Sequence, residues 1–87
     1  MSDITISSDV LAQEVDGETV LLDLASESFF GLDPVSTRVW QLLNEGASRE
    51  NLIDTLLEEY EVEREVLEKD VSELLNRLVD AGLIALG

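Results

Sequence analysis

The residues that most often perform catalysis are scarce in this sequence. It has no cysteine and no histidine, which excludes thiol nucleophiles, disulfides, zinc–thiolate sites and the commonest general base. Serines are present, but none lies in a Gly-x-Ser-x-Gly turn, and no histidine could activate one. Carboxylate pairs such as Glu58 with Glu59 would need an enclosed pocket for acid–base chemistry, and solvent-exposed helix faces explain them better. We therefore predict that the protein is not an enzyme.

Motifs for metals and cofactors are missing as well. The segment Asp16-Gly17-Glu18 is a turn signal rather than the spaced oxygen ligands of an EF-hand loop, and there is no glycine-rich phosphate loop. The chain is as small and acidic as an acyl carrier protein. However, it lacks the Asp-Ser-Leu motif that carries the phosphopantetheine arm, and its first third favours strands. We expect no metal and no cofactor.

The charge of the chain restricts its partners. Twenty acidic residues against five basic ones give the 87-residue chain a net charge of -15. Nucleic acids and anionic membranes are excluded as partners because both are bound through Lys and Arg. The first ten residues lack the basic start and apolar run of a signal peptide, and no segment approaches the ~20 apolar residues that span a bilayer. We expect a cytoplasmic protein that attracts a positively charged partner.

The first third of the chain predicts an antiparallel meander of three strands within residues 10–32. The dipeptide Asp16-Gly17 is a hairpin turn signal between the first two strands. In the second strand, Val20, Leu22 and Leu24 alternate onto one face. The third strand is expected at residues 28–32, and residues 4–6 could add a short edge piece.

The remainder predicts three helices, at about residues 34–45, 49–60 and 63–81. Asp33 and Pro34 supply an N-cap and a first-position proline to the first helix, and Ser48 caps the second. Each helix has apolar residues at three- and four-residue spacing, which predicts one buried face. Gly82 ends the third helix, and residues 83–86 can fold back as an extended tail. These elements predict one α+β domain, residues 1–87, with a winged-helix-like arrangement of a three-stranded antiparallel sheet followed by three helices.

The third strand has the character of an open edge that could bind a peptide. Edge strands are usually blocked by proline, lysine or a bulge, whereas residues 27–32 have one charge, at Glu27. An extended peptide could pair with this strand, and the third helix would form the far wall of a groove. Neighbouring residues of a strand point to opposite faces, so Phe29 and Phe30 differ in orientation, and we expect Phe30 to pack inward. DNA is not the expected ligand, because residues 58–73 hold eight acids against two bases.

Two segments resemble PqqD-like proteins. VLLDLASESFFGLDPVSTRVWQLL, residues 20–43, is similar to the family's central signature: a strand pair, an aromatic-aromatic-Gly-Leu-Asn/Asp stretch, and a helix with Val-Trp. EKDVSELLNRLVDAGLI, residues 68–84, is similar to the family's third helix and its Gly-Leu-Ile ending. The resemblance implies a RiPP precursor peptide recognition element. Such a domain binds the leader segment of a ribosomally synthesised precursor peptide by strand addition and presents it to other enzymes.

The resemblance also implies a site and a pathway. The Phe-Gly-Leu-Asp-Pro segment and Trp40 are most similar to the stand-alone leader-binding protein of lasso peptide biosynthesis. That protein works with a leader peptidase and a cyclase. Ser36 departs from the pattern, because many relatives have glycine at this position. The peptide-binding residues that it implies are Glu27, Ser28, Phe29, Phe30, Gly31, Leu32, Val66, Lys69, Asp70, Glu73, Leu74 and Arg77. Leu74 and Trp40 could instead belong to the core. The alternative functions are a PqqD chaperone of the quinone cofactor precursor and a structural module that dimerises through the same edge strand.

Overall fold

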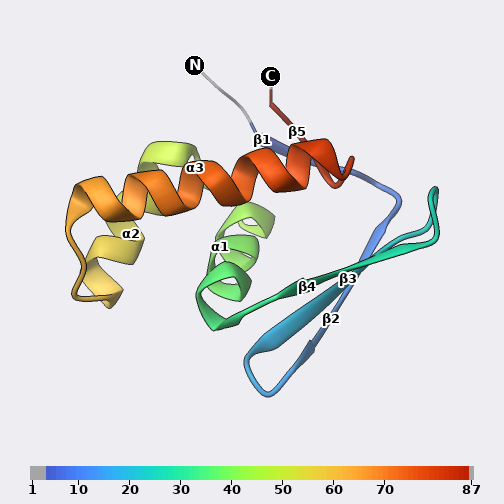
Figure 1. Ribbon diagram of the computed structural model, residues 1–87, viewed down its shortest axis with the longest axis horizontal. Helices are drawn as coiled ribbons and strands as arrows, with labels where there is room; N and C mark the ends of the chain where they lie inside the picture. Colours follow the sequence, from blue (N-terminus) through green and yellow to red (C-terminus); the bar gives the residue numbers. More distant parts are fainter. Residues whose placement is uncertain (1–3, 87) are drawn as a thin grey trace.

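The computed structural model describes residues 4–86, so both ends of the predicted domain, residues 1–3 and 87, lie outside the described residues. The elements are β1 (Ile4–Ile6), β2 (Val10–Val15), β3 (Glu18–Asp23), β4 (Ser28–Leu32), α1 (Pro34–Asn44), α2 (Arg49–Glu59), α3 (Arg64–Asp80) and β5 (Ile84–Leu86) (Figure 1). The α+β class is confirmed, with a three-stranded antiparallel sheet followed by three helices. None of the helices in residues 4–86 has both the length and the apolar content needed to cross a bilayer.

The three-stranded sheet is a meander in the order β2-β3-β4. The two-residue turn between β2 and β3 has positive φ at both Asp16 (53°) and Gly17 (81°), the geometry that matches the twist of a hairpin. After β3, the buried Asp23 carboxylate accepts hydrogen bonds from the Ala25 N–H (3.0 Å) and the Ser26 hydroxyl (2.9 Å). These bonds satisfy a buried charge and fix the turn that leads into β4.

The edge piece that the sequence predicts at residues 4–6 does not extend the meander. It forms β1, which pairs antiparallel with β5 in a separate two-stranded sheet, with Ile4 opposite Leu86 and Ile6 opposite Ile84. The predicted extended tail is therefore the partner of the predicted edge piece. Figure 1 shows this pair beside the carboxyl end of α3, where the two ends of the described chain meet.

The helices begin where their capping residues predict. The Asp33 carboxylate accepts a hydrogen bond from the Ser36 N–H (2.7 Å), Pro34 occupies the first position of α1, and the Ser48 hydroxyl accepts one from the Asn51 N–H (3.2 Å). Glu63 precedes α3 without a side-chain capping bond, and its backbone carbonyl accepts from the Leu67 N–H (3.0 Å). The Asp33 cap starts α1 directly after the end of β4.

One apolar core joins the sheet to the helices. Its buried members are Leu21, Leu32, Val39, Trp40, Leu42, Leu43, Leu52, Ile53, Leu56, Leu67, Val71, Leu74, Leu75, Leu78, Leu83 and Ile84. The inner face of β3 contributes Thr19, Leu21 and Asp23, whereas Val20 and Leu22 point away from the helices. The apolar face that the sequence predicts for this strand exists, but it is the outer one. Trp40 belongs to the core, and its indole N–H has no hydrogen-bond partner among the described residues.

Candidate functional site

β4 has one open edge beside the helices. It pairs with β3 along one side, and no strand within residues 4–86 pairs with its other side. Its sequence, SFFGL, has no charge, proline or bulge that would block a further strand. The open edge leads directly into Asp33 and the first turn of α1. An added strand would therefore run beside α1 and α3.

The hairpin register assigns the backbone groups that face this open edge. In a two-residue hairpin, the pair that flanks the turn, here Val15 and Glu18, exchanges hydrogen bonds, and such pairs alternate along an antiparallel ladder. The alternation continues from β3 to β4 through the registers Leu21 with Phe30 and Leu22 with Phe29. This alternation places the N–H and C=O groups of Ser28, Phe30 and Leu32 on the side of β4 that faces β3. The corresponding groups of Phe29 and Gly31 face the open edge and are available to another chain.

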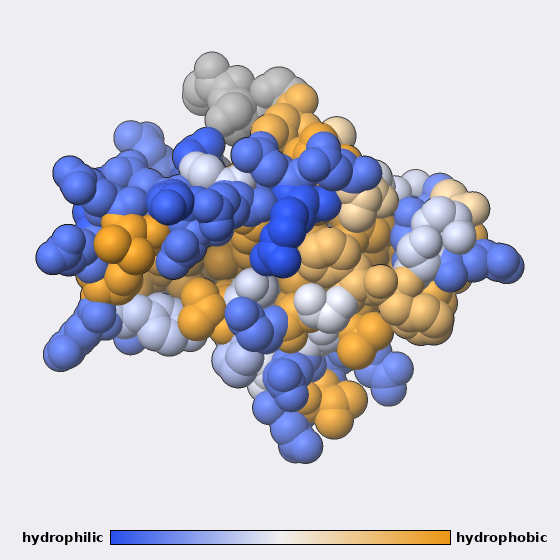
Figure 2. Space-filling model, viewed as in Figure 1, coloured by the Kyte–Doolittle hydropathy of each residue, from blue (hydrophilic) through white to orange (hydrophobic). Residues whose placement is uncertain are grey.

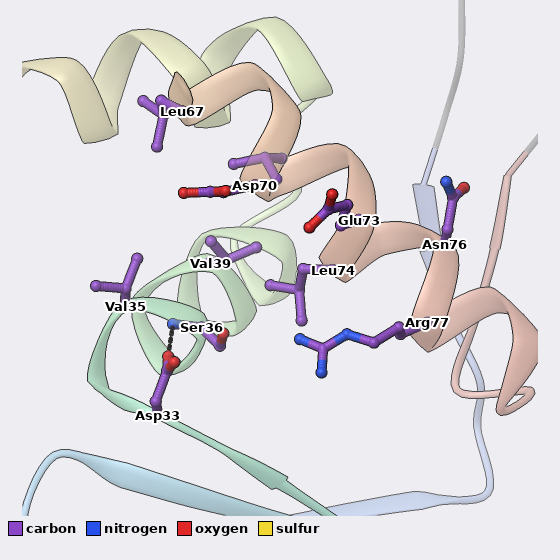
Figure 3. A pocket seen from close by; sticks show the side chains of 11 residues that line it. Asp33, Val35, Ser36, Val39, Leu67, Asp70, Glu73, Leu74, Asn76 and Arg77 are labelled. Atoms are coloured by element: carbon purple, nitrogen blue, oxygen red, sulfur yellow. Dashed lines mark hydrogen bonds between the residues drawn. The ribbon is translucent and has the colours of Figure 1, made fainter. Parts of the chain in front are cut away.

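A groove of about 750 Å³ separates the first turns of α1 from α3 (Figure 3). Its lining residues are Asp33, Val35, Ser36, Val39, Leu67, Asp70, Val71, Glu73, Leu74, Asn76 and Arg77. The buried members, Val39, Leu67, Val71 and Leu74, form an apolar floor. Figure 3 shows Asp70, Leu74 and Arg77 projecting from α3 toward α1, whereas Asn76 projects away from it. The groove can hold apolar side chains of a peptide and contact its polar groups at the rim.

The rim of the groove is mainly acidic. Asp33, Asp70 and Glu73 line it together with one base, Arg77. Within residues 4–86, neither Asp70 nor Glu73 forms a salt bridge, so both carboxylates can accept hydrogen bonds from a ligand. The acids are spread along the rim, and no three His, Cys, Asp or Glu side chains of the described chain are placed to hold a metal ion. Figure 2 shows mostly hydrophilic surface over α3 and hydrophobic surface below it, toward the sheet.

Arg77 links the groove to β4. Its guanidinium carbon lies 5.8 Å from the centre of the Phe30 ring, within the range of a cation–π contact. Phe30 is partly buried against the core, as the sequence predicts, whereas Phe29 is 74% exposed on the outer face of the sheet. The two adjacent aromatic rings therefore serve different surfaces: Phe30 belongs to the junction of sheet and α3, and Phe29 faces solvent.

The twelve residues implied by the resemblance fall into four groups. Asp70, Glu73, Leu74 and Arg77 line the groove, and Leu74 is at the same time a core residue that is 5% exposed. The segment Ser28–Leu32 forms the open strand. Glu27 precedes that strand in a turn with φ of 58°, so it does not belong to the paired segment. Val66 and Lys69 are exposed on α3 but do not line the groove.

Several groove residues were not predicted from the sequence. On α3, Leu67 and Val71 line the groove, and the predicted Val66 and Lys69 lie one or two positions away along the helix. The three- and four-residue spacing from Leu67 through Val71 and Leu74 to Arg77 could have identified this line. The contribution of α1, at Asp33, Val35, Ser36 and Val39, depends on how α1 packs across α3, and the sequence has no local signal for it.

A salt bridge holds α1 to the end of α2, outside the groove. The Arg38 guanidinium donates to the Glu59 carboxylate at 2.7, 2.9 and 3.1 Å, and the two side chains are 30% and 35% exposed. The hydrogen bonds to Glu59 raise the pKa of Arg38, and the hydrogen bonds from Arg38 lower the pKa of Glu59. Gln41 extends this contact to β2 by donating to the Glu14 carboxylate (2.9 Å). The network fixes α1, and with it one wall of the groove.

Comparison with known proteins agrees with this geometry. Residues 18–84 match the family described as coenzyme PQQ synthesis protein D (PqqD). The chain therefore belongs to the PqqD family. No protein among the curated sequences matches significantly.

Two solved structures share the fold across almost the whole chain. TbiB1 in complex with the TbiA(beta) leader peptide is 39% identical, with a TM-score of 0.89 over 92% of this chain and 93% of that one. A lasso peptide synthetase B1 complexed with the leader peptide is 28% identical, with a TM-score of 0.85 over 94% of this chain and 96% of that one. Both structures hold a leader peptide, and both confirm the resemblance that the sequence suggests.

Proposed function

We propose that this protein binds the leader segment of a ribosomally synthesised precursor peptide in lasso peptide biosynthesis. The observation that carries the proposal is the open edge of β4 beside a groove with an apolar floor. The leader would add to this edge as an antiparallel strand, with main-chain hydrogen bonds to Phe29 and Gly31, and would place alternate side chains toward α3. Peptide complexes of the two similar B1 proteins support this assignment.

The rim and floor of the groove indicate which leader side chains the groove can bind. Asp70 and Glu73 favour cationic or hydrogen-bond-donating side chains, and the floor around Leu74 favours apolar ones. The net charge of -15 would attract a basic leader at long range. We therefore assign the leader apolar residues at alternate positions, with at least one cationic or donor residue near Asp70.

The partners follow from the same proposal. An adaptor without catalytic groups would hold the leader while a leader peptidase and a cyclase act on the remainder of the precursor, in the cytoplasm where the precursor is made. The runner-up is a PqqD-type chaperone of the quinone cofactor precursor, favoured by the family match over residues 18–84. Both functions use the same edge, and the identity of the peptide that binds distinguishes them.

A sedimentation series with and without peptide tests the binding function. The probe is the fluorescently labelled synthetic leader of the precursor gene that neighbours the gene for this protein. We expect a monomer that binds the leader with 1:1 stoichiometry and does not bind a scrambled peptide of the same composition. A tight dimer that is indifferent to the leader would contradict the proposal and support a structural dimerisation module instead.

A further inference from the structure

Arg77 is the one base that lines the groove between α1 and α3, and within residues 4–86 it forms no salt bridge. Arg38 and Arg64, by contrast, pair with carboxylates at 2.7 Å and 3.4 Å. The chain holds twenty acidic residues, so its acids are abundant, yet no described one reaches the Arg77 guanidinium. The N–H donors of Arg77 are therefore available to a ligand in the groove.

The Phe30 ring holds this guanidinium in position. The Arg77 guanidinium carbon lies over the ring, 5.8 Å from its centre, and the ring is itself packed against the core. A guanidinium that stacks on an aromatic ring uses its flat face for the contact, whereas its N–H donors lie in its plane. Stacking therefore orients Arg77 and leaves its donors free for a planar partner. A carboxylate has the geometry that accepts two of these donors at once.

The register of β4 decides which leader residue would meet Arg77. Leader residues opposite Phe29 and Gly31 would form hydrogen-bonded pairs with this strand, and the residue between them would form a non-hydrogen-bonded pair with Phe30. Side chains directly opposite each other share a face of the sheet. The leader side chain opposite Phe30 would therefore point toward the helices, and its two neighbours would point to the other face. Of these three leader residues, only the one opposite Phe30 would lie beside both the ring and the Arg77 guanidinium.

We propose that Arg77 is a specificity-determining residue that binds the carboxylate of an Asp or Glu residue of the leader, at the position opposite Phe30. The proposal rests on the proposed function, because strand addition at β4 defines this position. The other charged residues of the rim, Asp33, Asp70 and Glu73, would repel such a carboxylate. A slip of the leader by one residue would turn the carboxylate to the other face of the sheet, and a slip by two toward the end of β4 would bring it near Asp33. Arg77 therefore fixes the register of the leader as well as its charge pattern.

The test is a double-mutant cycle between Arg77 and the acidic residues of the leader. The probe is the labelled synthetic leader of the neighbouring precursor gene, in which each Asp or Glu is replaced in turn by Asn or Gln, and fluorescence anisotropy measures its affinity for the full-length wild type and for Arg77→Gln. Arg77→Lys keeps the charge but loses the planar fork. Arg64→Gln is the matched control, because it removes the same charge from α3 outside the groove. Intermolecular NOEs identify the leader residue opposite Phe30, since the Cα atoms of a non-hydrogen-bonded pair lie only about 4.5 Å apart.

We expect one leader carboxylate, the one opposite Phe30, to couple with Arg77. Its replacement by the amide should weaken binding to the wild type about five- to tenfold and should have little effect on binding to Arg77→Gln. Arg77→Lys should recover only part of the difference, and Arg64→Gln should behave as the wild type.

Three results would overturn the role of Arg77 while leader binding stands. They are equal losses with wild type and Arg77→Gln for every leader carboxylate, coupling at a leader residue that is not opposite Phe30, and a bound leader segment without any acidic residue. A wild-type protein that does not bind the leader at all would instead overturn the proposed function.

Discussion

Replacing Phe29 with proline tests strand addition at a single backbone group. The register directs the Phe29 N–H toward the open edge of β4, so Phe29→Pro removes a donor that β3 does not use. The free protein should keep its sheet, and its thermal midpoint should change little. The complex, however, should lose one main-chain hydrogen bond and leave a leader carbonyl without its partner.

The size of the effect follows from the exposure of this edge. A net hydrogen bond contributes about 0.5–1.5 kcal/mol. We take the added penalty for the carbonyl left behind at the low end of the range for an unpaired group, about 1 kcal/mol, because it lies at a strand edge. Together these amount to about 1.5–2.5 kcal/mol, which corresponds to a roughly 10- to 60-fold weaker affinity. Fluorescence anisotropy with the labelled leader would measure it.

Two further variants isolate the cause. Phe29→Thr also removes the ring but keeps the N–H, so its affinity should stay within about fivefold of the wild type, since a cross-strand side-chain pair contributes about 0.2–1 kcal/mol. Phe30→Pro removes a donor that faces β3, so it should lower the thermal midpoint by at least about 4 °C, the shift that 1 kcal/mol produces in a domain of this size. A folded Phe29→Pro variant with wild-type affinity would refute strand addition at β4.

Three other variants test the groove and its support. Leu74→Ala should lower the free energy of unfolding in urea by about 2–5 kcal/mol and also weaken leader binding, because Leu74 belongs to both the core and the groove. A loss of stability without any loss of affinity would show that Leu74 acts only in the core. The double variant Asp70→Lys, Glu73→Lys should weaken binding of a basic leader and reduce the salt dependence of its affinity; an unchanged titration would show that these acids do not contact the leader. Glu59→Gln should have a lower free energy of unfolding than the wild type at pH 7, because the hydrogen bonds from Arg38 lower the pKa of Glu59 in the folded state. This difference should vanish as the pH falls below 4.5 and through the lowered pKa of Glu59. A pH-independent difference in urea unfolding would contradict this explanation.

The local parts of the fold could be predicted from the sequence because each has a local cause. Capping chemistry predicts two helix starts, one at Asp33 with Pro34 and one at Ser48. The dipeptide Asp16-Gly17 predicts a hairpin because both residues tolerate positive φ. The open edge at residues 28–32 could also be predicted, since it depends on the absence of blocking residues along one strand. In each case, the residues that decide the structure lie within a few positions of one another.

The parts that the sequence did not predict depend on contacts between distant segments. The pairing of β1 with β5 joins residues about 80 positions apart, and neither strand by itself indicates its partner. In β3, alternation would favour burying the more apolar face, yet the structure buries Thr19, Leu21 and Asp23 and exposes Val20. The buried Asp23 is tolerated because the following turn donates two hydrogen bonds to it. The more apolar face of β3 is therefore the one left outside the core.

Amide hydrogen exchange along β4, measured by NMR with and without the leader, tests the central claim most directly. If the leader adds as a strand to β4, the Phe29 and Gly31 amides become protected when it binds. The amides of Phe30 and Leu32, already bonded to β3, should change much less. Protection that appears at the β2 edge, with Phe29 and Gly31 exchanging as fast as in the free protein, would contradict it.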